Sequence, residues 1–319
     1  MNTQKRTRLV ADVGGTNSRI ALWDPALNEL SNRCDYLNED FESFNAVIAA
    51  WLAQLNEPAP EQACVAIAAP PFDDLVEMPS IDWSFSIRQT AKQFGFDDMR
   101  VINDFEANAY SLPHLSQNDI VTIHQGEAGS SGKLAAVGPG TGLGGAAFGL
   151  VAGRPTASAC EPGHMSLAPA TPMELELFSL LLKKHPVIYA ELLLSGRGLP
   201  RLYAAVAEVM GEKAEVLGAP EISARAQTEE YPTCSQTMET FCALLGSICG
   251  DFVLAQGAYG GLYLCGGILP KMVALLSNSS FQTRFTAKGE MQEYLQAVPI
   301  HVITSGRAGL IGAAHTPLS

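Results

Sequence analysis

The sequence predicts an α/β protein with two lobes. At 319 residues the chain is longer than one hydrophobic core usually fills, which favours two lobes. Short apolar strands alternate with amphipathic helices along it, and this alternation is typical of α/β domains. An apolar strand, a glycine turn and a second apolar strand occupy residues 9–23 and recur at 134–151, so we also expect a weak internal duplication.

The first half opens with a hairpin rather than with a strand, a loop and a helix. Residues 9–13 are expected to form a buried strand, 14–17 a turn and 18–23 a second strand in which polar and apolar residues alternate. The elements expected after the hairpin are a helix at 44–55, a strand at 64–68, a helix that Ser86 caps and that runs to Phe94, and a strand at 99–102.

The second half begins near Pro113 and repeats the alternation of strands and helices. Its expected elements are strands at 134–137, 146–151, 262–265 and 300–303, and helices at 173–182, 199–210, 237–255 and from 308. The helix at 237–255 has one apolar side, which we expect to be buried, and residues 211–232 are the most loop-like stretch.

The charge and the cysteines limit the kinds of partner. A formal net charge of −13 at pH 7 repels nucleic acid and anionic membranes, so an anionic ligand would need a local site of backbone N–H groups and a metal ion. No uninterrupted apolar run approaches the ~20 residues that span a bilayer. The seven cysteines are odd in number and form no C-x-x-C pair, so we expect free thiols in a reducing cytoplasm.

The first candidate binding site is the turn of the opening hairpin. Gly14 and Gly15 would let the backbone contact a bulky anion and point N–H groups at it, and Thr16 and Asn17 add side-chain donors. Asp12, at the end of the strand, suits a Mg²⁺ ion bound through water. The alternative is a tight hairpin with a polar tip.

A second glycine-rich turn at residues 138–145 contains G-x-G-x-x-G, and Glu161 lies roughly where a dinucleotide fold places its ribose-binding acid. That fingerprint must open a helix, whereas residues 145–149 are expected to form a strand. The sequence has no G-x-x-x-x-G-K-[ST] motif, which excludes a P-loop. Two glycine hairpins facing each other across a cleft would instead hold a triphosphate from both sides.

Asn103 and Asp104 follow a buried strand, at the edge of the sheet where α/β proteins bind ligands. Asp104 can accept a proton from a hydroxyl group, which is the task of the base in phosphoryl transfer. Asn103 can donate to and accept from neighbouring hydroxyls. The alternative is that the pair caps a helix, since both residue types are favoured there.

Three further positions are candidates. Glu161 and His164 lie three residues apart on a turn and could clamp two sugar hydroxyls, or they could belong to a plain surface turn. Glu191 could be a ligand or an ordinary glutamate on a helix surface. Gly266 and Gly267 end a strand, where they could make room for a flat ring such as adenine or cap the strand. The sequence has no H-E-x-x-H, G-x-S-x-G or paired Cys/His cluster, so it predicts neither a zinc site nor a serine hydrolase.

These motifs occur together, in the order and with the spacing of one family: the chain resembles the bacterial glucokinases of the hexokinase–actin-like superfamily. The matching stretches run nearly from end to end and are Asp12-Val13-Gly14-Gly15-Thr16-Asn17-Ser18-Arg19, Ile102-Asn103-Asp104-Phe105, Gly138-Pro139-Gly140-Thr141-Gly142-Leu143-Gly144, Glu161-Pro162-Gly163-His164, Ala190-Glu191 with Leu194-Ser195-Gly196, Cys265-Gly266-Gly267-Ile268, and Gly309-Leu310-Ile311-Gly312-Ala313-Ala314. Each stretch alone has little specificity, whereas the ordered set is specific.

The resemblance implies a two-lobed actin-like or hexokinase-like fold with a cleft between a smaller and a larger domain. The smaller α/β domain would comprise residues 1–113 plus 304–319, with the C-terminal helix returning to it, and the larger α/β domain residues 114–303. The implied activity is transfer of the γ-phosphoryl group of ATP to the 6-hydroxyl of glucose. The family expectation is a cytoplasmic homodimer with no nucleic-acid or membrane partner.

The resemblance also carries over the family's site residues, position by position. It implies that Asp104 is the general base. Glucose binding is implied for Asn103, Glu161, His164 and Glu191. Binding of Mg²⁺ and ATP is implied for Asp12 (the metal, through water), for Gly14, Gly15, Thr16, Asn17, Thr141 and Gly142 (the phosphates), and for Gly266 and Gly267 (the adenosine).

The chain departs from the family pattern at two places near the expected sugar site. Pro162 stands where the family commonly has glycine, and proline fixes φ and removes an N–H. Pro79-Ser80-Ile81-Asp82 precedes Trp83, where the family tends to have Thr-Asn. Because of these departures, a kinase for another hexose remains an alternative function. The competing class is a non-catalytic sugar sensor on the same fold, against which the retention of Asp12 and Asp104 argues, and an oxidoreductase is a third alternative.

Overall fold

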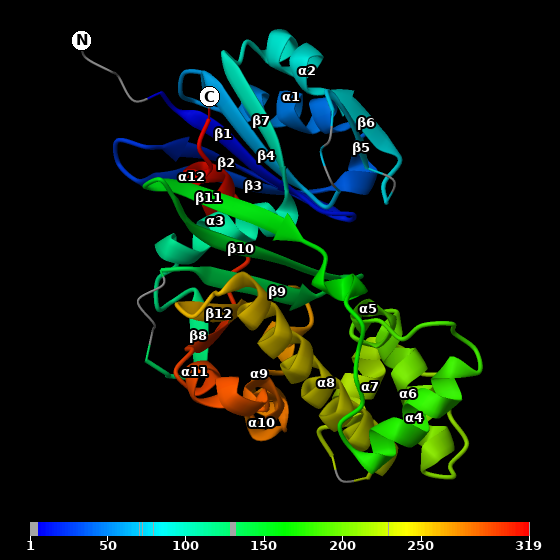
Figure 1. Cartoon of the computed structure of the whole chain (residues 1–319). Coiled ribbons are helices and arrows are strands. Elements are labelled where there is room, and N and C mark those ends of the chain that lie inside the picture. Colours follow the sequence, from blue (N-terminus) through cyan, green and yellow to red (C-terminus); the bar gives the residue numbers. More distant parts are fainter. Residues whose placement is uncertain are drawn as a thin grey trace. The chain divides into compact units, whose positions relative to one another are not determined.

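The computed structural model describes residues 6–69, 71, 73–78, 80–127, 132–228 and 230–318, so Pro79 of the second family departure lies outside the described residues. The described residues form two compact units (Figure 1). The first unit comprises Met1–Leu115, Val151–Ala159 and Ser305–Ser319, and the second Ser116–Leu150 and Cys160–Thr304. Both contain strands and helices, and the predicted α/β class is confirmed.

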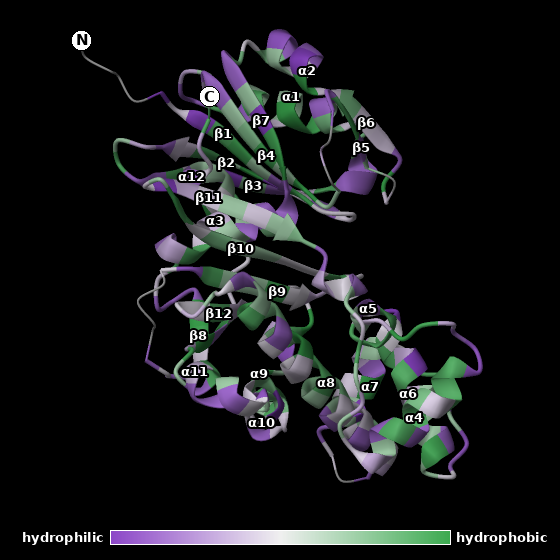
Figure 2. Cartoon of the chain, viewed as in Figure 1, coloured by the Kyte–Doolittle hydropathy of each residue, from purple (hydrophilic) through white to green (hydrophobic). Residues whose placement is uncertain are grey.

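The first unit is built on a five-stranded sheet of order β3-β2-β1-β4-β7. The three parallel strands are β1 (Arg8–Val13), β4 (Gln62–Ile67) and β7 (Asp98–Asn103). β2 (Asn17–Asp24) pairs antiparallel with β1, and β3 (Glu29–Leu37) pairs antiparallel with β2. Figure 2 shows the hydrophobic colour concentrated on the central strands of this sheet, in agreement with their burial.

Helices cover both faces of this sheet, because its central strands are apolar on both sides. Leu9, Ala11 and Val13 share a core with α1 (Phe44–Gln54), and α12 (Ala308–His315) packs on β1 and β4. The other elements of the unit are β5 (Leu75–Met78), β6 (Trp83–Ser86), α2 (Ile87–Phe94) and α3 (Asp104–Ser111). The C-terminal helix α12 lies so close to α3 that a Cβ on Gly312 would overlap the carbonyl oxygen of Ala107.

The second large sheet has the strand order β11-β10-β9-β12-β13-β8. Its strands, in chain order, are β8 (Ile120–His124), β9 (Leu134–Pro139), β10 (Leu143–Val151), β11 (Arg154–Cys160), β12 (Gly261–Leu264) and β13 (Ile300–Ile303). β9 has its antiparallel hairpin partner β10 on one side and the parallel strand β12 on the other, as β1 has β2 and β4. The matching topologies support the expected internal duplication.

The helices of the second unit are α4 (Pro172–Leu182), α5 (Ala190–Leu193), α6 (Gly198–Val209), α7 (Ala219–Arg225), α8 (Pro232–Gln256), α9 (Val273–Asn278), α10 (Phe281–Thr286) and α11 (Gln292–Gln296). The prediction of a loop at 211–232 was partly wrong, because α7 forms inside it. α8 is long and apolar enough to cross a membrane, yet 72% of its most apolar window is buried within the protein, as expected of a core helix.

Candidate active site

The turn between β1 and β2 presents backbone N–H groups that the described part of the protein does not use. The Gly14 N–H donates to the Asn17 carbonyl at 2.9 Å, but the N–H groups of Gly15 and Thr16 have no acceptor among the described residues. Gly15 has no positive φ, and a Cβ added to it would lie 3.4 Å from Ser80 Oγ, close to ordinary contact. The fold therefore hardly requires glycine at this position, whereas a ligand that approaches the backbone would.

Asp12 lies at the end of β1, half-buried beside Arg19 of β2. The Arg19 Nη1 donates to Asp12 Oδ2 at 3.1 Å, and the Arg19 Nε lies 3.8 Å from Asp35 Oδ2. Arg33 holds Asp35 through two bonds of 2.9 Å. Burial raises the pKa of Asp12, and the charge of Arg19 opposes that rise. α12 approaches the same carboxyl group, since a Cβ on Gly309 would lie 2.7 Å from Asp12 Cγ.

The sheet register brings Asp104 to the same edge as Asp12. In the parallel strands β1, β4 and β7, Asp12 is level with Ala66, and Ala66 is level with Ile102, two residues before Asp104. Two strand spacings amount to roughly 10 Å. The two acidic side chains thus stand at the carboxyl ends of β1 and β7, the parallel strands on either side of β4, at the edge where α/β sheets bind their ligands.

Asn103, not Asp104, caps the helix that follows. The Asn103 Oδ1 accepts from the N–H groups of Phe105 at 2.9 Å and Glu106 at 3.4 Å, so the capping alternative holds for Asn103. Asp104 occupies the first helical position and accepts from the Phe105 N–H at 2.9 Å. Burial and the negative charge of Asp12 raise the pKa of Asp104 to about 6. A carboxylate with such a pKa is well matched to general-base chemistry near neutral pH.

The turn between β9 and β10 is held by other backbone groups of the second unit. The Gly140 N–H donates to the Gly142 carbonyl at 2.7 Å, and the Gly196 N–H donates to the Gly140 carbonyl at 2.8 Å. Because a trans peptide is planar, its N–H points opposite to its carbonyl, and the Thr141 N–H points away from Gly196. The second turn therefore also presents an N–H group outward.

Glu191 lies under this second turn. Its Oε2 accepts from the Leu143 N–H at 2.9 Å, and a Cβ on Gly142 would overlap its carboxylate. The interpretation of Glu191 as an ordinary helix-surface glutamate was therefore wrong, because the side chain is half-buried and bonded to the turn.

Glu161 and His164 stand on a short 3₁₀ turn with exposed side chains, 78% and 63% accessible. The His164 Nδ1 lies 3.8 Å from Glu161 Oε2, and the imidazole stacks on Tyr189 with ring centroids 5.5 Å apart. Pro162 takes the first position of the turn, where a missing N–H is tolerated. Tyr189 lies two residues before Glu191 and had not been selected from the sequence, because an isolated tyrosine carries no local signal of a site.

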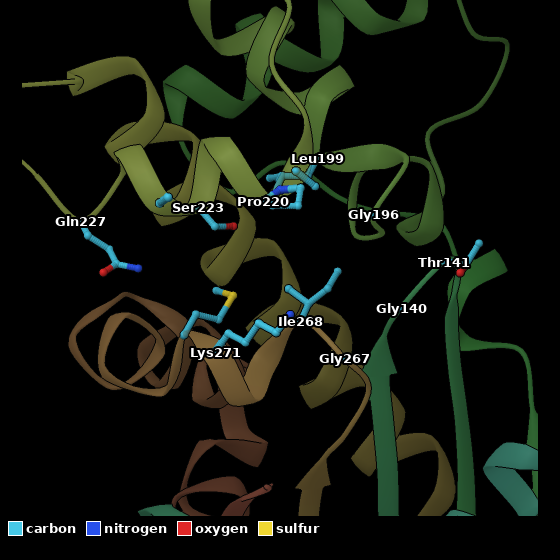
Figure 3. A pocket seen from close by; sticks show the side chains of 13 residues that line it. Gly140, Thr141, Gly196, Leu199, Pro220, Ser223, Gln227, Gly267, Ile268 and Lys271 are labelled. Carbon is cyan, nitrogen blue, oxygen red and sulfur yellow. The ribbon is translucent and has the colours of Figure 1, made fainter. Parts of the chain in front are cut away.

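A cavity of about 530 Å³ adjoins the second turn (Figure 3). Its walls are mainly apolar and small, with a few polar groups, and comprise Gly140, Thr141, Gly196, Leu199, Ala219, Pro220, Ser223, Ala224, Gln227, Gly267, Ile268, Lys271 and Met272. Figure 3 shows Pro220 and Ser223 across the cavity from Ile268 and Lys271. The volume and the mixed lining are typical of small-molecule sites, and a nucleoside fits both.

The two glycines after β12 differ in what they do. Gly266 has a φ of +90°, and a Cβ on it would lie 2.5 Å from the carbonyl oxygen of Pro139. A Cβ on Gly267 would meet nothing within 4 Å. The fold thus requires glycine at 266, whereas Gly267 borders the cavity and leaves space there.

The residues present fit a magnesium–nucleotide better than a metal bound by protein alone. Among the described residues no group of three His, Cys, Asp or Glu side chains could hold a metal ion. Mg²⁺ is commonly bound through one or two carboxylates together with phosphates and water. Asp12 Oδ1 has no hydrogen-bond partner in the described part of the chain, which leaves one oxygen for such an ion or its water.

The duplicated sheets, the acidic pair at one sheet edge and the nucleoside-sized cavity define a two-unit α/β protein of the hexokinase-like class. The Glucokinase family model matches residues 9–318. The chain is 38% identical over 308 residues to the glucokinase of Caulobacter sp. (strain K31), which covers 96% of this chain and 93% of that protein. The chain belongs to the Glucokinase family.

Solved structures agree with this assignment. The crystal structure of a glucokinase from an Antarctic psychrotroph is 39% identical and superposes with a TM-score of 0.91, covering 97% of this chain and 98% of that one. A ROK family glucokinase from Streptomyces griseus, solved with glucose and AMPPNP, covers 97% of this chain and 98% of its own at a TM-score of 0.61. At 19% identity, this second likeness shows the fold alone.

Proposed function

We propose that this chain is an ATP-dependent kinase that phosphorylates glucose at its 6-hydroxyl, with Asp104 as the general base. The observation that carries the proposal is the half-buried Asp104 carboxyl at the sheet edge, near Asp12 and with its pKa raised to about 6. The names of the relatives, glucokinases over nearly the whole chain, support the same activity.

We assign glucose binding to Asn103, Glu161, His164 and Glu191. The Asn103 Oδ1 is occupied by the helix cap, so its Nδ2 group remains to donate to a sugar hydroxyl. Glu191 has one oxygen on the Leu143 N–H and keeps Oε1 for a hydroxyl. Asp104 would take the proton of the 6-hydroxyl onto its carboxylate as that oxygen attacks the γ-phosphorus of ATP, and the bond from the γ-phosphorus to the β–γ bridging oxygen would break and release ADP.

The nucleotide would be held chiefly by backbone. We assign the phosphates to Gly14, Gly15, Thr16 and Asn17 and to Thr141 and Gly142, the adenosine to Gly266 and Gly267 beside the cavity, and the metal, through water, to Asp12. Bound Mg²⁺ would supply positive charge to the phosphate oxygens. The backbone N–H groups of the turns would add further positive charge, which favours an anionic ligand on a chain whose net charge is negative.

We propose that residues 1–113 plus 304–319 and residues 114–303 act as the two domains of a cytoplasmic homodimer with no nucleic-acid or membrane partner. Glucose is the proposed substrate, and another hexose is the alternative that Pro162 motivates. A panel of hexoses with ATP and Mg²⁺, compared by kcat/KM, distinguishes them.

The test of the function is Asp104→Ala, assayed by ADP release with glucose. We expect kcat to fall at least ~100-fold while glucose and MgATP still bind within about threefold of the wild type, as after loss of a general base. Glu106→Ala is the matched control, because it removes an acid of the same helical turn. Near-normal turnover in Asp104→Ala would remove Asp104 from its role. A wild type that binds glucose but turns over no hexose would be a sugar sensor.

A further inference from the structure

Asn38 lies behind the first glycine turn with its polar groups bonded. Asn38 is only 4% exposed. Its Nδ2 donates to the Gly14 carbonyl at 2.8 Å, and its backbone N–H donates to the Thr16 carbonyl at 2.9 Å. Its Oδ1 accepts from the buried Ser18 hydroxyl at 2.7 Å. One residue outside the glycine motif thus holds two carbonyl groups of the turn.

These bonds set the direction of the turn's N–H groups. None of the peptide bonds in the described residues is cis, and in a planar trans peptide the N–H points opposite to the preceding carbonyl. Since the Gly14 carbonyl points at Asn38, the Gly15 N–H points away from it. The Thr16 carbonyl also points at Asn38, so the Asn17 N–H points away as well.

We infer that Asn38 is a positioning residue for the nucleotide: it holds the Gly14–Gly15 peptide so that the Gly15 N–H faces outward to receive a phosphate oxygen. This inference rests on the proposed kinase function. Two adjacent glycines give the turn more backbone freedom than any other pair, and a rotated peptide would present a carbonyl oxygen to the phosphate instead. Asn38 removes that freedom before the ligand arrives, which favours binding.

The main test is Asn38→Leu, which keeps a similar shape and removes the side-chain bonds. We expect the Kd for MgADP, measured by calorimetry, to rise about 10-fold, as for a lost preorganised donor, while the Kd for glucose stays within twofold. The KM for MgATP should rise by a similar factor, and kcat at saturating MgATP should change less than threefold.

Three other variants test which hydrogen bond of Asn38 matters for MgADP affinity. Asn38→Asp keeps an acceptor for Ser18 but cannot donate to the Gly14 carbonyl, so we expect at least the same loss of MgADP affinity. Ser18→Ala leaves that donation intact and should cost less than threefold. Asn45→Leu is the matched control, because Asn45 also makes two side-chain bonds, to Gln93 and Thr90, but away from the turn. It should leave MgADP affinity unchanged.

The outcomes separate this inference from the proposed function. Unchanged MgADP affinity in both Asn38 variants, with normal binding by the wild type, overturns the role of Asn38 alone. An equal loss of glucose and MgADP affinity, together with a lower free energy of unfolding, shows a merely structural residue and also overturns it. A wild type that binds no MgADP overturns the kinase function and this inference with it. If Asn38→Leu does not fold, Asn38→Asp decides.

Discussion

The two glycine turns occupy equivalent places in the duplicated sheets, yet different groups hold them. In the first turn, between β1 and β2, the side chain of Asn38 donates to the Gly14 carbonyl and its backbone N–H donates to the Thr16 carbonyl. In the second turn, between β9 and β10, the Gly196 N–H donates to the Gly140 carbonyl, and the Glu191 carboxylate accepts from the Leu143 N–H of β10. One residue, Asn38, holds the first turn, whereas the backbone of Gly196 and the half-buried carboxylate of Glu191 hold the second.

The glycines of the two turns also differ in how much space surrounds them. A Cβ on Gly15 would find nearly ordinary contact distances, whereas one on Gly142 would overlap Glu191. Next to the second turn, Gly266 has a positive φ and touches Pro139. Similar glycine patterns therefore have two causes: room for a ligand in the first turn, and close packing of the chain in and around the second. Substitutions can separate these causes.

The largest effect is expected from Gly15→Val in the first turn. The isopropyl group would occupy the space through which a phosphate approaches the backbone, so MgATP affinity should fall more than ~100-fold. Because Ser80 is the nearest neighbour and leaves nearly enough room, the free energy of unfolding should change by less than about 1 kcal/mol. Calorimetric titration and urea unfolding measure the two quantities. Unchanged nucleotide affinity would contradict a backbone cradle at this turn.

The opposite result is expected from Gly266→Ala beside the second turn. A Cβ there would meet the Pro139 carbonyl on a backbone with φ of +90°, so the free energy of unfolding should fall by about 2–3 kcal/mol. The neighbouring Gly267→Ala is the matched control and should stay within about 0.5 kcal/mol, since nothing lies within 4 Å. Equal stabilities of the two variants, measured by urea unfolding, would mean that the second turn does not depend on close packing.

Much of the fold was predictable because its strands and helices carry strong periodic patterns. The opening hairpin, the helix capped by Ser86 and the strands at 134–151 were all expected, and the structure has them. Elements with mixed patterns were missed. β3 alternates exposed and half-buried residues with little apolar signal, and α7 is only seven residues long within a polar stretch.

The candidate site was predictable where the chemistry lies in a local motif, and less so where it depends on contacts between distant residues. Asp12 and Asp104 were selected from strand ends, and the register brings them to one edge. The contact between Arg19 and Asp12 could have been found, since a hairpin turning at 14–17 pairs these residues across the strands. Asn38 and Tyr189 carry no local signal, because their roles arise from tertiary contacts.

A smaller effect is expected from Glu191→Gln, which tests what the second turn does for the sugar. The amide oxygen can still accept from the Leu143 N–H, so the turn should keep its shape. The lost charge should weaken the bond to a sugar hydroxyl, and we expect the KM for glucose to rise about 10-fold while that for MgATP changes less than twofold. A rise in both constants, seen in steady-state kinetics, would mean that Glu191 serves the turn and not the sugar.

The smallest expected effect is on the free energy of unfolding, and it comes from Asp104, which with Asp12 forms the acidic pair at the sheet edge of the first unit. The pKa of Asp104 is about 6 in the folded protein, above the roughly 3.9 of an unfolded aspartate. The folded state therefore holds this proton more tightly between about pH 4 and pH 6, and its stability falls as the pH rises through that range.

Asp104→Asn removes this penalty, because asparagine never ionises. A pKa shift of about two units corresponds to at most about 3 kcal/mol, and solvent screening of this half-buried carboxyl reduces that figure. The free energy of unfolding of the variant should therefore exceed that of the wild type by about 1 kcal/mol at neutral pH, and the gain should disappear below about pH 4, where the wild-type carboxyl is protonated in both states. Urea unfolding at several pH values measures the difference. A gain that does not depend on pH would arise from packing or hydrogen bonding, and the acidic pair would then not be the feature that distinguishes the first unit from the second.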